Sequence, residues 1–123
     1  MKLNLADIFD SIQNEKYVVM KLSDTFPDYQ LGSDIDILCQ DNQQVVSKVI
    51  PILNTYISDE SKVKVTDYGG QIHVDILENG RIHLRFDLYS KNPGYKNVVL
   101  RPEYYVSVIE HSRTVNVGSI NVK

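Results

Sequence analysis

The sequence feature that most constrains the fold of this chain is an alternation of acids and isoleucines, Ser33-Asp34-Ile35-Asp36-Ile37-Leu38. Successive side chains of a β-strand leave opposite faces, so Asp34 and Asp36 would share one face, roughly 6.5–7 Å apart along the chain. The intervening isoleucines would then pack behind the sheet. The pattern predicts a strand over Ser33 to Cys39, with one apolar face against a core and an acidic face opposite it.

Two carboxylates on one face repel each other, which raises the proton affinity of at least one of them unless a cation lies between them. Mg²⁺ or Mn²⁺ is the natural neutraliser, because hard cations prefer oxygen ligands, and carboxylates that hold such ions commonly serve phosphates. The alternative is a half-buried strand whose polar face meets water, with Gly32 and Ser33 forming a plain turn.

Length and composition indicate a single domain over residues 1–123, either complete or a piece of a longer protein. The net charge of −3 gives no electrostatic case for duplex nucleic acid or a membrane surface as partner. Cys39 is the single cysteine, so no disulfide framework is possible, and a buried, inert thiol is expected. The chain contains no apolar run of ~20 residues and no signal-peptide pattern, which favours a cytoplasmic location.

A helix and a strand are expected before the acidic strand, and a second helix after it. Apolar residues at helical spacing predict a helix over Leu5 to Ile12, with Asn4 as its N-cap. A buried strand over Tyr17 to Leu22 follows. A second apolar stripe predicts a helix from Asp41 to Tyr56, with Asp41 or Asn42 as its N-cap. Pro51 inside it predicts a kink or two shorter helices.

The strongest local prediction is a β-hairpin around Asn79-Gly80, because Asn-Gly between two alternating runs favours a type I′ turn. A two-residue turn with regular pairing would set Glu78 opposite Arg81, Val74 opposite Arg85 and Ile72 opposite Asp87. This register predicts that Asp75 lies on the opposite face from Asp87, and that His83 lies on the Asp87 face across from Ile76. A further strand over Lys62 to Tyr68 and a turn at Gly69-Gly70 are expected before the hairpin.

Beyond Ser90 the sequence predicts a short strand over Val98 to Leu100, a weak helix or strand over Tyr104 to His111, and a final hairpin. That hairpin would join Thr114–Val117 to Ile120–Val122 through Gly118-Ser119. Strands and helices interleave early and strands cluster later, so the fold class expected is α/β, a mixed α+β sheet with helices packed mainly on one face.

The acidic strand, the helix after it and the segment Arg85-Phe86-Asp87-Leu88-Tyr89 resemble the nucleotidyltransferase superfamily with the DNA polymerase β-like fold. Members carry D-x-D on one strand and a third acid, flanked by apolar residues, on a later strand. Tyr17-Val18-Val19-Met20-Lys21 ahead of Gly-Ser-Asp-Ile-Asp-Ile-Leu is similar to nucleotidyltransferase-like proteins found with bacterial surface-polysaccharide genes. The resemblance spans roughly Glu15 to Tyr89.

The resemblance implies a reaction that transfers a nucleoside monophosphate from a nucleoside triphosphate to a small-molecule or sugar-linked acceptor and releases pyrophosphate. Asp34 and Asp36 would bridge two Mg²⁺ or Mn²⁺ ions, and Asp87 would complete the cage and help to activate the acceptor hydroxyl. The residues expected to contact the nucleotide are Lys21, Ser23, Gly32, Ser33 and Arg85.

Other readings stay open. The superfamily has a Gly-Ser pair about ten residues before D-x-D, but here Leu22 precedes Ser23, and a leucine side chain would crowd the close backbone approach that glycine permits. This departure favours a second hypothesis, a non-catalytic module that keeps the fold and binds a protein or ligand. A third hypothesis is a structural divalent cation. Asp75 is an alternative to Asp87 as third acid, because Val74-Asp75-Ile76 has the same apolar flanks.

Overall fold

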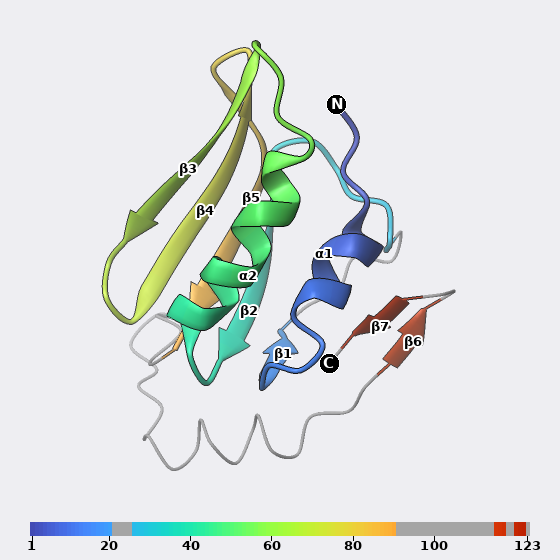
Figure 1. Cartoon of the computed structure of the whole chain (residues 1–123), viewed down its shortest axis with the longest axis vertical. Helices are drawn as coiled ribbons and strands as arrows, with labels where there is room; N and C mark the ends of the chain where they lie inside the picture. Colours follow the sequence, from blue (N-terminus) through green and yellow to red (C-terminus); the bar gives the residue numbers. More distant parts are fainter. Residues whose placement is uncertain (21–25, 91–114, 118–119, 123) are drawn as a thin grey trace.

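The computed structural model describes residues 1–20, 26–90, 115–117 and 120–122. It is a mixed α+β structure: a five-stranded sheet, two helices, and a separate two-stranded hairpin (Figure 1). The predicted fold class is therefore confirmed. The elements are α1 (Leu5–Ser11), β1 (Tyr17–Val19), β2 (Ser33–Cys39), α2 (Asn42–Asn54), β3 (Ser61–Asp67), β4 (Gln71–Glu78), β5 (Arg81–Tyr89), β6 (Val115–Val117) and β7 (Ile120–Val122).

The large sheet has the strand order β1-β2-β5-β4-β3, so the strand that carries the two aspartates lies next to the strand that carries Asp87. β2 and β5 are parallel, whereas β1–β2, β3–β4 and β4–β5 are antiparallel. Helix α2 is the crossover that takes the chain from β2 to β3 at the far edge of the sheet. The order thus brings together two acidic segments that are about fifty residues apart in the sequence.

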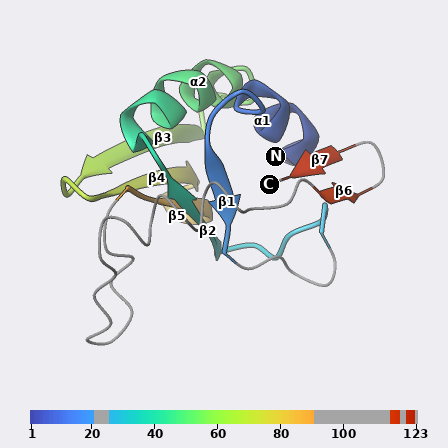
Figure 2. The ribbon, with the colours of Figure 1, turned by 90° about the horizontal axis from the view of Figure 1, so that it is seen from below.

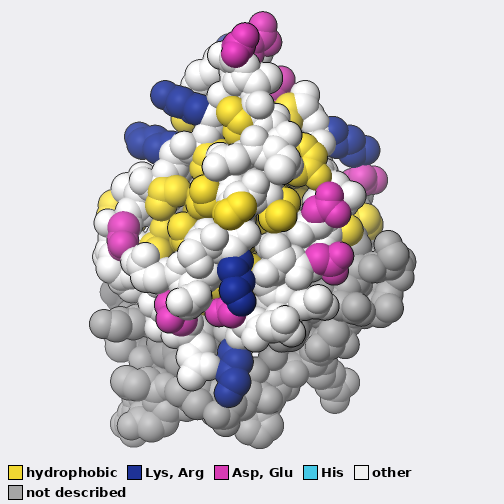
Figure 3. Space-filling model, in the orientation of Figure 1, with side chains coloured by type: hydrophobic (Ala, Val, Ile, Leu, Met, Phe, Trp, Pro, Cys, Tyr) yellow, Lys and Arg dark blue, Asp and Glu magenta, His cyan; other side chains and the backbone are white. Residues whose placement is uncertain are grey.

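Both helices cover the same face of the sheet (Figure 2). Alternate residues of β2, β4 and β5 bury their side chains beneath α2, whose residues Val45, Val49 and Leu53 are 0–2% exposed. Figure 3 shows this helix-bearing side, with hydrophobic side chains gathered near its centre. The acidic side chains of β2 therefore project to the opposite face, as the alternation predicted. None of the described helices is long and apolar enough to cross a membrane.

The helix caps follow the predictions. The Asn4 side chain accepts a hydrogen bond from the backbone N–H of Ala6, and Asp41 Oδ1 accepts one from Gln44 N–H at 3.2 Å. The second helix runs through Pro51 as one element, so the expectation of two shorter helices is wrong. Pro51 is exposed and lies in the final turn, where few backbone hydrogen bonds remain to be lost.

The predicted hairpin forms, but its register is not the regular one. Asn79 and Gly80 have φ of 52° and 76°, as a type I′ turn requires, and Glu78 pairs with Arg81. The register then shifts, because Leu77 pairs with Ile82 whereas Ile76 pairs with Leu84. One extra residue of β5, His83, is accommodated at this bulge.

The bulge overturns three pairing predictions. Val74 pairs with Phe86, not with Arg85, and Ile72 pairs with Leu88, not with Asp87. His83 does not lie across from Ile76; its ring instead contacts Tyr29 Oη at 2.7 Å and Glu78 Oε2 at 3.3 Å. A one-residue shift moves the side chains of a strand to the opposite face relative to the neighbouring strand. Beyond the bulge, each β4 residue therefore shares a face with the β5 residues that were predicted to lie opposite it.

The predicted last hairpin also forms, with β6 and β7 antiparallel. It lies beside α1 (Figure 1). The predicted strand over Val98 to Leu100, the element predicted over Tyr104 to His111, and residues Lys21, Leu22 and Ser23 lie outside the described residues.

Candidate functional site

The face of the sheet opposite the helices carries polar side chains in rows that run across the strands, because directly paired residues of neighbouring strands project to the same side. The first, here the acid row, runs from β2 through β5 and β4 to β3 and consists of Asp36, Asp87, His73 and Thr66. The second, here the charge row, crosses the same strands and consists of Asp34, Arg85, Asp75 and Lys64.

Asp36 and Asp87 are the first two members of the acid row, on β2 and β5. They are direct Cα partners across the parallel strands, and their carboxyl groups are hydrogen bonded to each other, which requires a proton on one of them. Asp87 is 7% exposed. Burial, the hydrogen bond with Asp36 and the negative charges of Asp36 and Asp34 raise the pKa of Asp87 to about 7, against the opposing effect of Arg85. Asp87 therefore retains its proton to a much higher pH than an exposed aspartate does.

His73 extends the acid row on β4. Its Nε2 lies 3.2 Å from Asp87 Oδ1 and 2.8 Å from the side-chain nitrogen of Gln71. Asp87 Oδ1 is buried and receives no hydrogen bond from His73 or from any other described group. A buried carboxylate oxygen without a donor retains the capacity to bind a cation, so the donor set of Asp36 and Asp87 suits a hard divalent ion.

The charge row alternates in sign from strand to strand. Arg85 donates from Nε to Asp75 Oδ1 at 2.5 Å and from Nη2 to Asp75 Oδ2 at 3.2 Å. Asp75 is 7% exposed. Its hydrogen bond with Arg85 is the main reason why the pKa of the Arg85 guanidinium is raised. Arg85 thus neutralises Asp75 and lies beside Asp34, its Cα partner on β2.

Asp75 therefore lies on the same face as Asp87, and the prediction that the two acids face opposite sides is wrong. The bulge at His83 reverses the alternation, so Asp75 pairs with Arg85. Its carboxylate oxygens are both bonded to that guanidinium. The neighbour of Asp36 on the adjacent strand is Asp87, which favours Asp87 over Asp75 as the third acid.

The structure places the described site candidates on or next to this face. Asp34, Asp36 and Asp87 share it, with Asp34 one row away from the other two. Gly32, with φ of 79°, and Ser33 lie where β2 begins, and the Gly32 N–H donates to the His83 carbonyl at 2.8 Å. Within the described part of the chain, no three acidic, histidine or cysteine side chains converge closely enough to hold one ion together. Among the described residues, Asp36 and Asp87 are thus paired directly, whereas Asp34 does not join them in a three-residue group.

Sequence reasoning missed His73, which was given no site role, and it misplaced Asp75. Both errors have the same source, since the face of every β4 residue relative to β5 depends on the bulge. The sequence gives no signal for a bulge at His83, which lies within a regular alternation of apolar and polar residues. The type I′ turn alone predicts an unbroken register.

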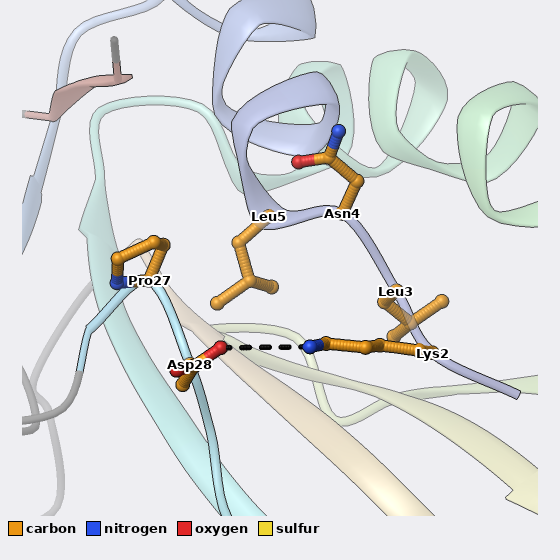
Figure 4. Close-up of a pocket in the computed structure, with 6 residues that line it drawn as sticks. All are labelled: Lys2, Leu3, Asn4, Leu5, Pro27 and Asp28. Atoms are coloured by element: carbon orange, nitrogen blue, oxygen red, sulfur yellow. Dashed lines mark ion pairs between the residues drawn. The ribbon is translucent and has the colours of Figure 1, made fainter. Parts of the chain in front are cut away.

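Two hollows lie away from the acid row. One, of about 260 Å³, separates the start of α1 from the segment at Pro27 and Asp28, and the ion pair of Lys2 with Asp28 crosses it at 3.8 Å (Figure 4). Both side chains of this pair are more than 70% exposed, so the pair contributes little. The other, of about 660 Å³, adjoins the β4–β5 turn and includes Gly32 and Arg81.

Cys39 lies at the end of β2 on the helix side, where it is fully buried. Burial, with smaller effects from Asp41 and Glu15, raises the pKa of its thiol to about 12. A thiol with so high a pKa is not a nucleophile near neutral pH, in agreement with the predicted inert role.

Comparison of the chain with models of protein families, with curated proteins and with solved structures finds no match.

Proposed function

We propose that this protein is a divergent metal-dependent nucleotidyltransferase, which transfers a nucleoside monophosphate from a nucleoside triphosphate to a small-molecule or sugar-linked acceptor. The observation that carries the proposal is the direct pairing of Asp36 with Asp87 on parallel strands, with Asp34 on the same face. Two acidic segments distant in sequence meet on this face, and burial and the neighbouring acids raise the pKa of Asp87, a cost that a bound divalent cation would remove.

The residues that would hold Mg²⁺ or Mn²⁺ are Asp36 and Asp87, with Asp34 directed to a second ion or to the metal-bound triphosphate. Bound there, the metal would neutralise phosphate charge and orient the attacking and leaving oxygens. The chain's own contribution is positional. The strands fix the two carboxyl groups, and Arg85, held by Asp75, supplies a cation next to Asp34 toward phosphate oxygens.

The observed order of the strands agrees with the proposed activity. The end of β1 lies beside Asp36, since the Met20 N–H donates to the Asp36 carbonyl at 2.9 Å. The segment that contains Lys21 and Ser23 begins directly after it in sequence. The resemblance to nucleotidyltransferases implies that these two residues contact the triphosphate.

A test is the release of pyrophosphate from each nucleoside triphosphate with Mg²⁺ or Mn²⁺ and a panel of sugar and small-molecule acceptors. Asp36→Asn should lower the rate by roughly two orders of magnitude or more, because the metal contributes several kcal/mol. Asp59→Asn, an exposed acid between α2 and β3, is the matched control and should leave the rate unchanged. Turnover that Asp36→Asn leaves intact would contradict the proposal.

A second candidate is a non-catalytic module with the same fold. The observation that favours it is Leu22, which stands before Ser23 where the superfamily has glycine. This candidate predicts that Mn²⁺ and nucleotide bind without turnover, and that Leu22→Gly increases the affinity for the triphosphate. Pyrophosphate release by the unmodified chain would exclude it.

A further inference from the structure

The acid row continues toward an exposed aromatic side chain at the β3–β4 turn. Tyr68 is 64% exposed, and its ring packs edge-on against the His73 ring, with ring centroids 5.0 Å apart. Nε2 of the same histidine lies 3.2 Å from Asp87 Oδ1. Two contacts therefore lead from the carboxyl pair to an aromatic side chain that is mostly open to solvent.

The turn that carries Tyr68 is held at several points. The Tyr68 N–H donates to the Gln71 carbonyl at 2.8 Å, and the Gly69 N–H donates to Asp67 Oδ1 at 2.7 Å. From α2, Gln43 donates to Asp67 Oδ2 at 2.7 Å, and the buried Asn42 donates to the Gly69 carbonyl at 3.4 Å. An exposed ring on an anchored turn loses little freedom when a ligand packs on it.

We propose that Tyr68, supported by His73, is the platform on which the nucleobase of the bound nucleotide stacks. This inference rests on the proposed nucleotidyltransferase function. A phosphate near Asp36 and Asp87 would lie next to His73, and His73 in turn contacts Tyr68 of the β3–β4 turn, so the nucleoside could extend toward this ring. Stacking on an aromatic face tolerates every base, so the site would accept several nucleotides and favour purines for their larger rings.

The Tyr68 hydroxyl is not needed for stacking, which separates this role from hydrogen bonding. Tyr68→Phe should therefore retain nucleotide affinity, whereas Tyr68→Ala should lose it. The matched control is Val65→Ala. Val65 is an exposed apolar residue of β3 at 45% exposure, but it pairs with Val74 on the other face of the sheet.

The experiment is calorimetric titration of the full chain with Mn²⁺ and two ligands, an α,β-methylene analogue of ATP and inorganic tripolyphosphate. Tyr68→Ala should weaken binding of the analogue by roughly 5- to 100-fold and leave the affinity for tripolyphosphate within about twofold. Circular dichroism checks that the variant is folded, as expected for an exposed side chain.

The outcomes separate the two proposals. If Tyr68→Ala leaves the affinity for the analogue unchanged, or weakens both ligands equally, the stacking role is overturned while the acid site stands. If the unmodified chain binds neither ligand, or if Asp36→Asn binds both as well as the unmodified chain does, the proposed function falls and the stacking role falls with it.

Discussion

Asp36 and Asp87 lie directly opposite each other on the parallel strands β2 and β5, and a hydrogen bond joins their carboxyl groups. A buried Asp87 next to the half-buried Asp36 opposes folding unless a proton or a cation lies between the two acids. The sheet nevertheless fixes this pair at its centre, flanked by His73 and Arg85. The proposed divalent-cation site would give two adjacent acids a role at positions that apolar residues could fill.

The first prediction concerns pH. In the folded chain Asp87 keeps its proton up to about pH 7, whereas an unfolded aspartate loses it near pH 4. The folded state therefore binds more protons between these values, so the free energy of unfolding falls as the pH rises, by at most about 1.4 kcal/mol per pH unit. This stability is complete below about pH 4 and is lost as the pH rises through about 7.

Urea unfolding in the presence of a chelator, at intervals from pH 4.5 to pH 8, measures this fall. Asp87→Asn removes the titrating group and should flatten the curve relative to the unmodified chain. Equal pH dependence in the two proteins would show that the pair does not retain its proton on folding.

The second prediction concerns the charge row. Arg85→Met removes the partner of the buried Asp75 and should destabilise the fold by about 2–3 kcal/mol at pH 7, because a buried carboxylate is left unpaired. Arg81→Met, a change of the same kind at an exposed position of the β4–β5 turn, should cost less than about 0.5 kcal/mol. Similar losses in the two variants, measured by urea unfolding, would argue that the Arg85–Asp75 pair contributes no more than a surface charge.

Much of the fold could be predicted from the sequence because its signals are local. The Asp–Ile alternation gives β2, the caps Asn4 and Asp41 give the helix starts, and Asn79-Gly80 gives the hairpin. The pairing of β2 with β5 could not be predicted in this way, because it joins segments separated by a helix and two strands. It depends on packing of the whole core, which no single window of sequence reports.

The third prediction tests the turn on which the β4–β5 register depends. Gly80 has a φ of 76°, which a residue with a Cβ adopts only with strain, so Gly80→Ala should cost about 1 kcal/mol. Asn79→Gly should be close to neutral, since glycine accepts the φ of 52° found there. Thermal unfolding distinguishes the two, and an equal melting temperature for Gly80→Ala and the unmodified chain would contradict the type I′ turn.

The fourth prediction concerns Pro51, which lacks the N–H that would bond to the Ser47 carbonyl within α2. Pro51→Ala restores this donor at an exposed position and should stabilise the protein by about 1–2 kcal/mol, part of the gain being offset by greater freedom of the unfolded chain. Urea unfolding measures the change. A destabilised variant would show that the proline ring makes packing contacts that outweigh the missing bond.

The candidate site was only partly predictable. Asp34 and Asp36 follow from strand alternation alone, and Asp87 from its likeness to the third acid of a known superfamily. The placement of His73, Asp75 and Tyr68 on the same face as Asp87 depends on the extra residue at His83, because this residue shifts the register between β4 and β5. A single bulge thus separates what local pattern can predict from what tertiary structure decides.

The most direct test of the central claim, that Asp36 and Asp87 form one cation site, is Mn²⁺ binding followed by electron paramagnetic resonance and calorimetry at pH 7.5. The unmodified chain and Asp59→Asn should bind Mn²⁺ alike, whereas Asp36→Asn and Asp87→Asn should each lose that binding. Equal Mn²⁺ binding in all four proteins, or none in any, would contradict the claim.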